Sequence, residues 1–226
     1  MNVKKTKTMA ISKNEDIQAV IIVDGKQLEQ VQQFKYLGQT ITNEGKSNKE
    51  IEIRIAQAKS MFIKLKDIFM SSDISLDLKL RAINLYVYSI LLYGDETWTL
   101  YVESIKRLEA FEMWIFRRLA RISYKDRVTN EEVLRRLGVE RRLLSQIKTH
   151  KLSYFGHIAR HDSLQKTVLT GRMEGKRGRG RPRRQWYDDI REWTGNQLYT
   201  NIMLAQDRVA WRGMASRPQN GPQQPG

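Results

Sequence analysis

The feature that most constrains the fold is a change in hydrophobic spacing near Asn48. From there, apolar residues recur at alternating steps of four and three, which places them on one face of a helix and leaves Lys and Glu on the other. The residues of this face are Ile51, Ile55, Ala58, Phe62, Leu65 and Phe69. Such a face must be buried against a partner, so the sequence predicts packed helices from this point onward.

Short strands are predicted before this point, between Ile17 and Thr42. Asp24 and Gly25 separate two extended runs, and this dipeptide is typical of a tight hairpin turn. A third run, FKYLGQTIT, follows, and Gly38 within it indicates a bulge or a bend. These patterns predict a small β part ahead of the helices.

Two long helical patterns follow the first. One begins near Ser75 and runs through INLYVYSILLYG to a stop at Gly94. Because apolar residues surround it, we expect this helix to be the central buried element. The other, 102–122, has a single apolar face. Three arginines lie off that face: Arg117, Arg118 and Arg121.

The next helices carry clearer boundary signals. Thr129 followed by Glu132 is a capping-box pattern that opens a short helix, NEEVLRRL, and Gly138 closes it. A longer helix is expected over about 140–160. The Gly- and Arg-rich stretch that follows predicts an extended linker, with two short helical patterns beyond it and a frayed end.

Charge and cysteine content limit the classes of partner and site. Lys and Arg total 40 against 25 Asp and Glu, for a net charge of +15. Because phosphates neutralised by cations release counterions, we expect DNA or RNA as the partner, with membrane surfaces as the competing anion. The absence of cysteine excludes disulfides, zinc fingers and zinc knuckles. No apolar run approaches the roughly 20 residues that span a bilayer, so an intracellular chain without a membrane partner is expected.

Eight segments, in order, resemble the carboxy-terminal part of reverse transcriptases from LINE-type, non-long-terminal-repeat retrotransposons. The resemblance covers almost the whole chain. The segments are NVKKTKTM, FKYLGQTIT, RIAQAKSMF, LLYGDETWTL, RRLARISYKDRVTNEEVL, KLSYFGHIAR, GKRGRGRPRRQWYDDI and AQDRVAWR.

The resemblance implies a mainly α fold with a small N-terminal antiparallel β part, an α+β class built around a thumb-like helical bundle. The implied divisions are 1–47 for the palm end with its hairpin, 48–170 for the thumb-like helices, 171–185 for a basic linker, 186–215 for short helices and 216–226 for a disordered tail. The family's catalytic palm would lie upstream, and this chain has no Tyr-x-Asp-Asp turn. Its adjacent acids Asp188 and Asp189 match a later region of the family. The resemblance therefore implies a truncated, non-catalytic chain.

The candidate nucleic-acid contacts are cations in three places: the FKYLG run, the helical face after Arg117 and the Gly/Arg stretch. A solvated surface is the alternative for the helical face, and core packing is the alternative for FKYLG. The candidates are Lys35, Arg117, Arg118, Arg121, Arg135, Arg136, Arg141, Arg142, Lys176, Arg177, Arg179, Arg181, Arg183 and Arg184. Trp186 and Trp193 are the candidates for stacking on unpaired bases, with core packing as their alternative.

Metal and catalytic sites have little support in the sequence. His157 and His161 have the spacing of two ligands on one helical face, but a metal would need a further ligand such as Asp162. Packed or surface imidazoles are the favoured interpretation, and we assign no metal, no cofactor and no catalytic residue. Motifs such as HExxH, GxSxG and a Gly-rich phosphate loop are missing.

The stretch GKRGRGRPRRQW resembles the Arg-Gly-Arg-Pro centre of an AT-hook, and it also suits a phosphate-binding arm or a nuclear-import signal. The leading hypothesis is a nucleic-acid-binding, non-catalytic remnant located in the nucleus, or in both nucleus and cytoplasm. The alternative is a protein-interaction module with an import signal, whose helices bind a protein partner through an apolar surface. A third hypothesis is a thumb that acts in trans with a separate polymerase chain.

Overall fold

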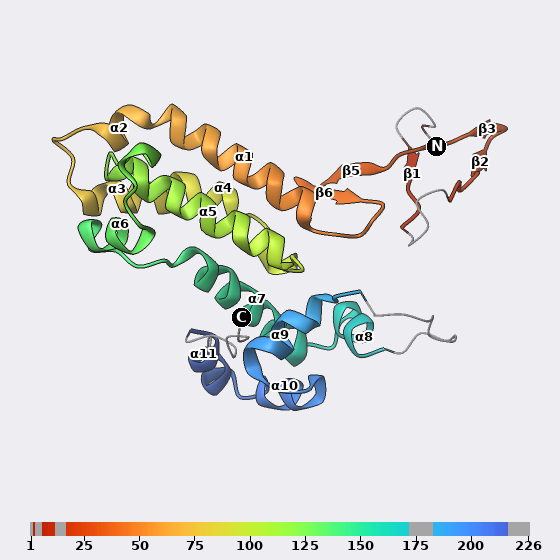
Figure 1. The fold of residues 1–226 in the computed structure, drawn as a ribbon. Coiled ribbons are helices and arrows are strands. Elements are labelled where there is room, and N and C mark those ends of the chain that lie inside the picture. Colours follow the sequence, from red (N-terminus) through yellow and green to blue (C-terminus); the bar gives the residue numbers. More distant parts are fainter. Residues whose placement is uncertain (1, 3–5, 12–16, 172–182, 217–226) are drawn as a thin grey trace.

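A computed structural model describes residue 2 and residues 6–11, 17–171 and 183–216. The fold is mainly α with short strands at the N-terminal side, as the sequence predicted. The helices form one packed body, and the strands extend from it to one side (Figure 1). No helix in these described ranges combines the length and apolarity needed to cross a bilayer.

The first strands form two small pairs. Strands β2 (Ile22–Val23) and β3 (Lys26–Gln27) are antiparallel, and the turn between them holds Asp24 at φ 50° and Gly25 at φ 70°. The predicted Asp-Gly hairpin is therefore confirmed. Strands β1 (Lys7–Thr8) and β4 (Glu29–Gln30) pair in parallel, which the antiparallel expectation did not include.

The FKYLG run forms a second hairpin. Strands β5 (Gln33–Tyr36) and β6 (Gln39–Thr42) are antiparallel, and Leu37 and Gly38 have φ values of 47° and 82°. The local pattern predicted one run with a bulge or bend at Gly38, but two consecutive residues with positive φ reverse the chain and form the hairpin that the resemblance implied. A leucine at such a position gives no turn signal in the sequence.

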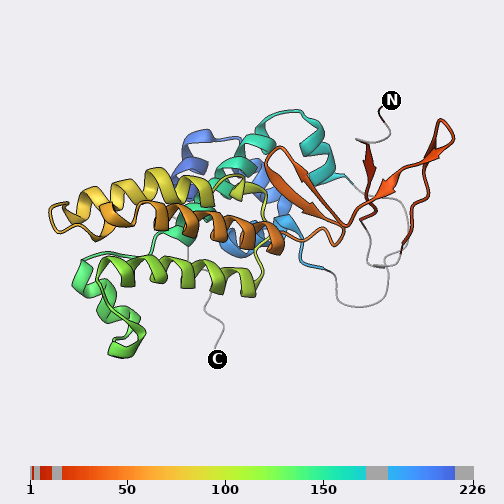
Figure 2. The ribbon, with the colours of Figure 1, turned by 90° about the horizontal axis from the view of Figure 1, so that it is seen from above.

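A buried ion pair attaches this hairpin to the helices. Glu50 accepts a hydrogen bond from the Thr40 backbone N–H at 2.7 Å and pairs with Arg54 at 2.6 Å. Arg54 in turn donates to the Gly38 carbonyl at 2.6 Å. The hairpin is thus fixed at the N-terminal end of α1 (Asn48–Lys64), as Figure 2 shows from above.

The predicted apolar face of α1 is confirmed: Ile51, Ala58 and Phe62 are fully buried. This face packs with α2 (Lys66–Met70) and α5 (Val102–Leu119). The rings of Phe62 and Phe69 stack at 4.6 Å, and Phe62 meets the Trp114 ring edge to face at 5.1 Å. Aromatic packing therefore joins the first helix to the fifth.

The helix beginning at Ser75 is less buried than predicted. It comprises α3 (Leu76–Ala82), a π-helical segment η1 (Ile83–Tyr88) and α4 (Ser89–Leu91). One side is core, but Leu78, Leu85 and Tyr86 are 55–66% exposed. The expectation of a central element was wrong, because these three apolar residues leave one side of the helix more than half exposed.

The predicted helix boundaries at Thr129, Gly138 and Gly94 are confirmed. Thr129 Oγ1 accepts from the Glu132 backbone N–H at 3.3 Å, and Gly138 ends α6 (Asn130–Leu137) with φ 61°. Gly94 at φ 73° follows the Ser75 helix and precedes the short turn η2 (Asp95–Thr97). A second short turn, η3 (Tyr124–Asp126), lies between α5 and α6.

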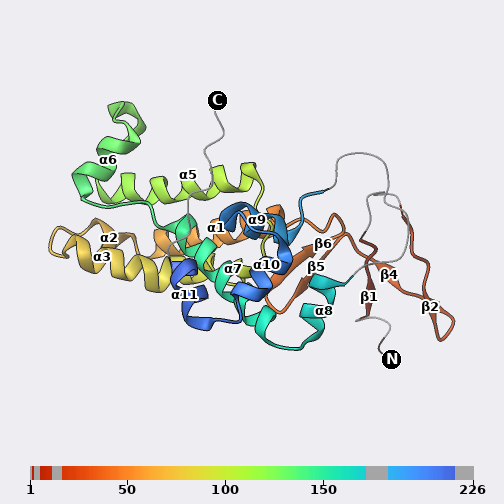
Figure 3. The same ribbon diagram turned by 90° about the horizontal axis from the view of Figure 1, so that it is seen from below.

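The C-terminal helices surround α7 (Leu143–Arg160), as Figure 3 shows. Trp211 donates from Nε1 to the Leu152 carbonyl at 2.8 Å. A Cβ atom at Gly156 would lie 2.4 Å from the same nitrogen, so glycine is needed for this approach. The helices are α8 (Leu164–Thr170), α9 (Trp186–Thr194), α10 (Leu198–Leu204) and α11 (Arg208–Ser216).

Candidate nucleic-acid interface

Three predicted arginines meet at the C-terminal end of α5. The guanidinium of Arg118 lies 3.7 Å from the centroid of the Trp114 ring, and its partial burial lowers the pKa of Arg118. Arg117 donates to the Val128 carbonyl at 2.7 Å. Arg121, just past the helix with φ 57°, donates to the Met70 carbonyl. We call these three residues the α5-end cluster.

The partners of the α5-end cluster are uncharged. They are backbone carbonyls, the Trp114 ring and the side-chain oxygen of Asn130, which is 3.0 Å from Arg117. Among the described residues, no carboxylate lies within salt-bridge distance of the three guanidiniums. The cluster borders a hollow of about 780 Å³ that Ser123 and Asn130 also line. Fixed guanidiniums with spare N–H groups suit bidentate contact with phosphate.

The predicted arginines Arg135 and Arg136 both contact the carboxylate of Glu132. Arg135 contacts both carboxylate oxygens of Glu132, at 2.7 and 2.8 Å, and Arg136 contacts one of them at 2.7 Å. These contacts hold the pKa of Glu132 at about 2. Two positive charges and one negative charge therefore leave this pair with a surplus of one.

The remaining predicted cations before the Gly/Arg stretch are spread out. Arg141 and Arg142 are exposed in the connection between α6 and α7, and Lys35 is exposed on β5. The hairpin of Lys35 lies at the opposite end of α1 from α6 (Figures 1 and 2). The structure thus brings together the α5-end cluster but not all of the candidates.

Only the last two cations of the Gly/Arg stretch are described. Arg183 is exposed and donates to the Glu44 carbonyl at 3.0 Å. Arg184 pairs with Asp189 at 2.7 Å and with Glu192 at 2.5 Å. Lys176, Arg177, Arg179 and Arg181 lie outside the described residues, as do most of the predicted linker and tail.

Asp189 is a buried structural anchor that the sequence interpretation missed. It is fully buried, accepts from the Leu100 backbone N–H at 3.0 Å and pairs with the equally buried Lys151. Burial lowers the pKa of Lys151 to about 8. Through Arg184, this group fixes the end of the Gly/Arg stretch to α7. The adjacent acids Asp188 and Asp189 in WYDDI were the sequence signal that could have identified this group.

The two stacking candidates are held by protein contacts. Trp186 donates from Nε1 to the Glu96 carbonyl at 2.8 Å and meets Tyr154 edge to face. Trp193 is only 8% exposed, with the Lys148 and Lys151 ammonium groups within 6 Å of its ring centroid. Stacking of a base on Trp193 would require this packing to open.

The histidines form no metal centre in the described ranges, where groups of three or more potential ligands are absent. The rings of His157 and His161 lie 4.5 Å apart. His150 contacts Asp95 at 2.9 Å, which raises the pKa of His150. Burial raises the pKa of Asp95 to about 6 despite this contact.

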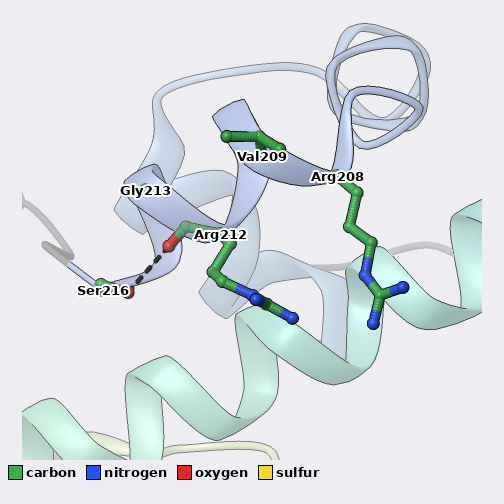
Figure 4. A pocket seen from close by; sticks show the side chains of 5 residues that line it. All are labelled: Arg208, Val209, Arg212, Gly213 and Ser216. Carbon is green, nitrogen blue, oxygen red and sulfur yellow. Dashed lines mark hydrogen bonds between the residues drawn. The ribbon is translucent and has the colours of Figure 1, made fainter.

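A further cationic pair was not predicted. Arg208 and Arg212 are exposed one turn apart on α11, and their side chains project to the same side of the helix (Figure 4). The i, i+4 spacing in QDRVAWRG was a signal for this pair.

Comparison with known proteins relates the chain to a mobile element. It is 28% identical over 206 residues to an uncharacterized transposon-derived protein of Caenorhabditis elegans, covering 84% of this chain and 72% of that protein. No protein-family model matches the chain. No solved structure matches it either. The similarity supports a transposon origin for this chain.

Proposed function

We propose that the chain binds nucleic acid without catalysing a reaction on it, and that the α5-end cluster supplies the main phosphate contacts. The observation that carries this proposal is that three guanidiniums are fixed together by uncharged partners. Their charge remains available to a phosphate, and each N–H group pointing outward can donate to a phosphate oxygen.

The finer proposal is descent from the carboxy-terminal part of a LINE-type reverse transcriptase. The order of the eight sequence segments supports it, and the transposon-derived relative is compatible with it. The β5–β6 hairpin and the helices after Asn48 would then correspond to the palm end and the thumb. In such a chain the described residues would supply phosphate contacts rather than the polymerase active site.

The spacing of the cations indicates how long a duplex would have to be to contact both cationic regions. Lys35 and Arg183 lie toward the hairpin end of α1, whose 17 residues separate them from the α5-end cluster. At about 1.5 Å per residue, this helix is roughly 25 Å long. A duplex with one charge per about 1.7 Å of axis could reach both regions along about seven base pairs.

The experiment is fluorescence anisotropy with labelled duplex DNA, single-stranded RNA and an RNA–DNA hybrid, titrated across salt. We expect binding that weakens steeply between roughly 50 and 200 mM salt. Absence of binding at low salt would refute the proposal. A parallel primer-extension assay with magnesium and nucleotides should give no product, and any extension would refute the non-catalytic part.

A second candidate function rests on the exposed apolar side of α3 and η1. Leu78, Leu85 and Tyr86 are more than half exposed, which suits contact with a protein partner. In that case the Gly/Arg stretch would act as a nuclear-import signal. Substituting Leu85 and Tyr86 with polar residues would abolish partner binding and leave nucleic-acid affinity unchanged, whereas the first proposal expects partner-independent binding of nucleic acid.

A further inference from the structure

A cavity of about 440 Å³ lies between η1, α5 and the start of α7. Tyr88 from η1, Glu112 and Phe116 from α5, and Gln146 from α7 line it. The connection after α6 closes one side and places Arg142 there. The cavity has the size of a small-ligand pocket and is separate from the hollow beside the α5-end cluster.

Two buried polar atoms at this cavity have no hydrogen-bond partner among the described residues. They are the hydroxyl of Tyr88, a side chain that is only 5% exposed, and the Oε1 atom of Gln146. Leaving such atoms unpaired costs free energy, so each one needs an explanation. Tyr88 also lies in a π-helical segment, a deviation that is frequent at functional sites.

Glu112 adds a buried carboxylate to the same cavity. Its Oε1 atom accepts from the backbone N–H groups of Arg142 and Leu143 at 2.8 and 2.9 Å, and no described residue bonds to Oε2. Burial raises the pKa of Glu112, while these two N–H groups and the charge of Arg141 lower it. The interior of the cavity therefore offers hydrogen-bond acceptors: a carboxylate, an amide oxygen and a phenol.

The rim has a different character. Arg142 is exposed there, next to the exposed Arg141. Two acids lie at the same rim: Asp77 is paired with Arg81 at 3.1 Å, and Glu140 is exposed. The two arginines against Glu140 leave one positive charge. A ligand that fits both regions bears N–H donors at one end and an anionic group at the other.

We infer that this cavity binds the base of an unpaired guanine nucleotide, with its phosphate at Arg142. Guanine presents N1–H and an exocyclic amine on one edge, and Glu112 Oε2 and Gln146 Oε1 are two acceptors at the cavity without a partner among the described residues. Phe116, 4% exposed, supplies an apolar wall for the ring. The inference rests on the proposed function, because it gives that binding a base preference.

The test uses mononucleotides, which separates it from the binding of long nucleic acids. Titration calorimetry of the full chain measures the affinities for GMP, IMP and AMP. The hydrogen-bonding edge of the base changes in two steps along this series. IMP lacks the exocyclic amine, and we expect about tenfold weaker binding from the loss of one hydrogen bond to a charged group. AMP has no N1–H donor and should bind more weakly still.

Tyr88→Phe is the matched variant, because it removes only an unpaired hydroxyl. Without nucleotide, removing this unpaired hydroxyl should be neutral or stabilising. We expect a melting temperature without nucleotide that is unchanged or higher, and about three- to tenfold weaker GMP binding. Glu112→Gln should bring the ratio of GMP to AMP affinity toward one, a readout that general destabilisation would not produce.

Equal affinities for the three nucleotides, unaffected by Tyr88→Phe, would mean that arginines bind phosphate alone and would overturn the inference. No GMP binding alongside tight, salt-sensitive binding of long nucleic acid would refute this inference only. Failure of both would refute the proposed function as well.

Discussion

The ends of α5 and α6 hold two groups of arginines in opposite ways. At the end of α5, carbonyls and a tryptophan ring hold Arg117, Arg118 and Arg121. At the end of α6, a carboxylate holds Arg135 and Arg136. Both groups are clustered arginines in the sequence, three in the first and two in the second. Under the proposed function, the partner of an arginine, rather than its presence, decides how much of its charge is left for a phosphate.

Arg184 belongs with the acid-bound group. It contacts Asp189 and Glu192, and the buried Lys151 shares Asp189. Its role is therefore to fix the end of the Gly/Arg stretch, while the contribution of Arg184 to phosphate binding should be small.

The largest expected effect follows from breaking this anchor. Asp189→Ala leaves Lys151 buried without its counter-charge and should lower the free energy of unfolding by about 3–5 kcal/mol. Urea denaturation measures this difference. The control is Glu192→Gln, which changes an exposed partner of Arg184 and should cost less than about 1 kcal/mol. Equal losses in the two variants would contradict the role of Asp189 as an anchor.

The next effect tests how the α5-end cluster is supported. Trp114→Ala removes the ring beneath Arg118 and its contacts with Phe62 and Phe111, so we expect a loss of about 3 kcal/mol in unfolding free energy. Nucleic-acid affinity at low salt should also fall, since Arg118 loses its fixed position. A stable variant with native affinity would show that the ring does not position Arg118.

A smaller effect comes from freeing the acid-bound pair. Glu132→Gln should release Arg135 and Arg136 and raise nucleic-acid affinity about threefold to tenfold at low salt. Glu131→Gln is the matched control, because it removes the same charge from the neighbouring exposed position. An equal gain from both variants would mean that only net charge matters.

The smallest effect is an absence of pH dependence. Because the pKa of Glu132 is lowered to about 2, its carboxylate is charged at every pH well above that value and becomes neutral only as pH falls through it. The affinity ratio of Glu132→Gln to the native chain should stay constant from about pH 5 to 8. A ratio that approaches one near pH 5 would indicate that Glu132 is protonated there.

The parts of the fold that were predictable depend on local chemistry. The apolar spacing from Ile51 to Phe69, the cap at Thr129 and the stop at Gly138 each involve residues within a few turns. The hairpin turn at Leu37–Gly38 was implied by the family resemblance but not by the local pattern, because a leucine gives no signal for positive φ. The exposed side of η1 was missed because composition does not show which neighbours cover a helix.

The candidate nucleic-acid contacts also divide into those set by local spacing and those set by contacts between distant segments. The pairing of Arg135 and Arg136 with Glu132 lies at helical spacings of three and four, which a sequence reveals. The carbonyl partners of Arg117 and Arg121 come from other elements, so their effect on charge appears only in the folded chain.

The most direct test of the central claim compares two double variants with the same change in charge. The slope of log affinity against log salt is measured for Arg118→Gln with Arg121→Gln, and for Arg135→Gln with Arg136→Gln. Losing two phosphate contacts should reduce the slope by about 1.8 in the first variant, and by less than half of that in the second. Equal changes, or a larger change in the second variant, would contradict the claim that uncharged partners leave the α5-end cluster free to bind phosphate.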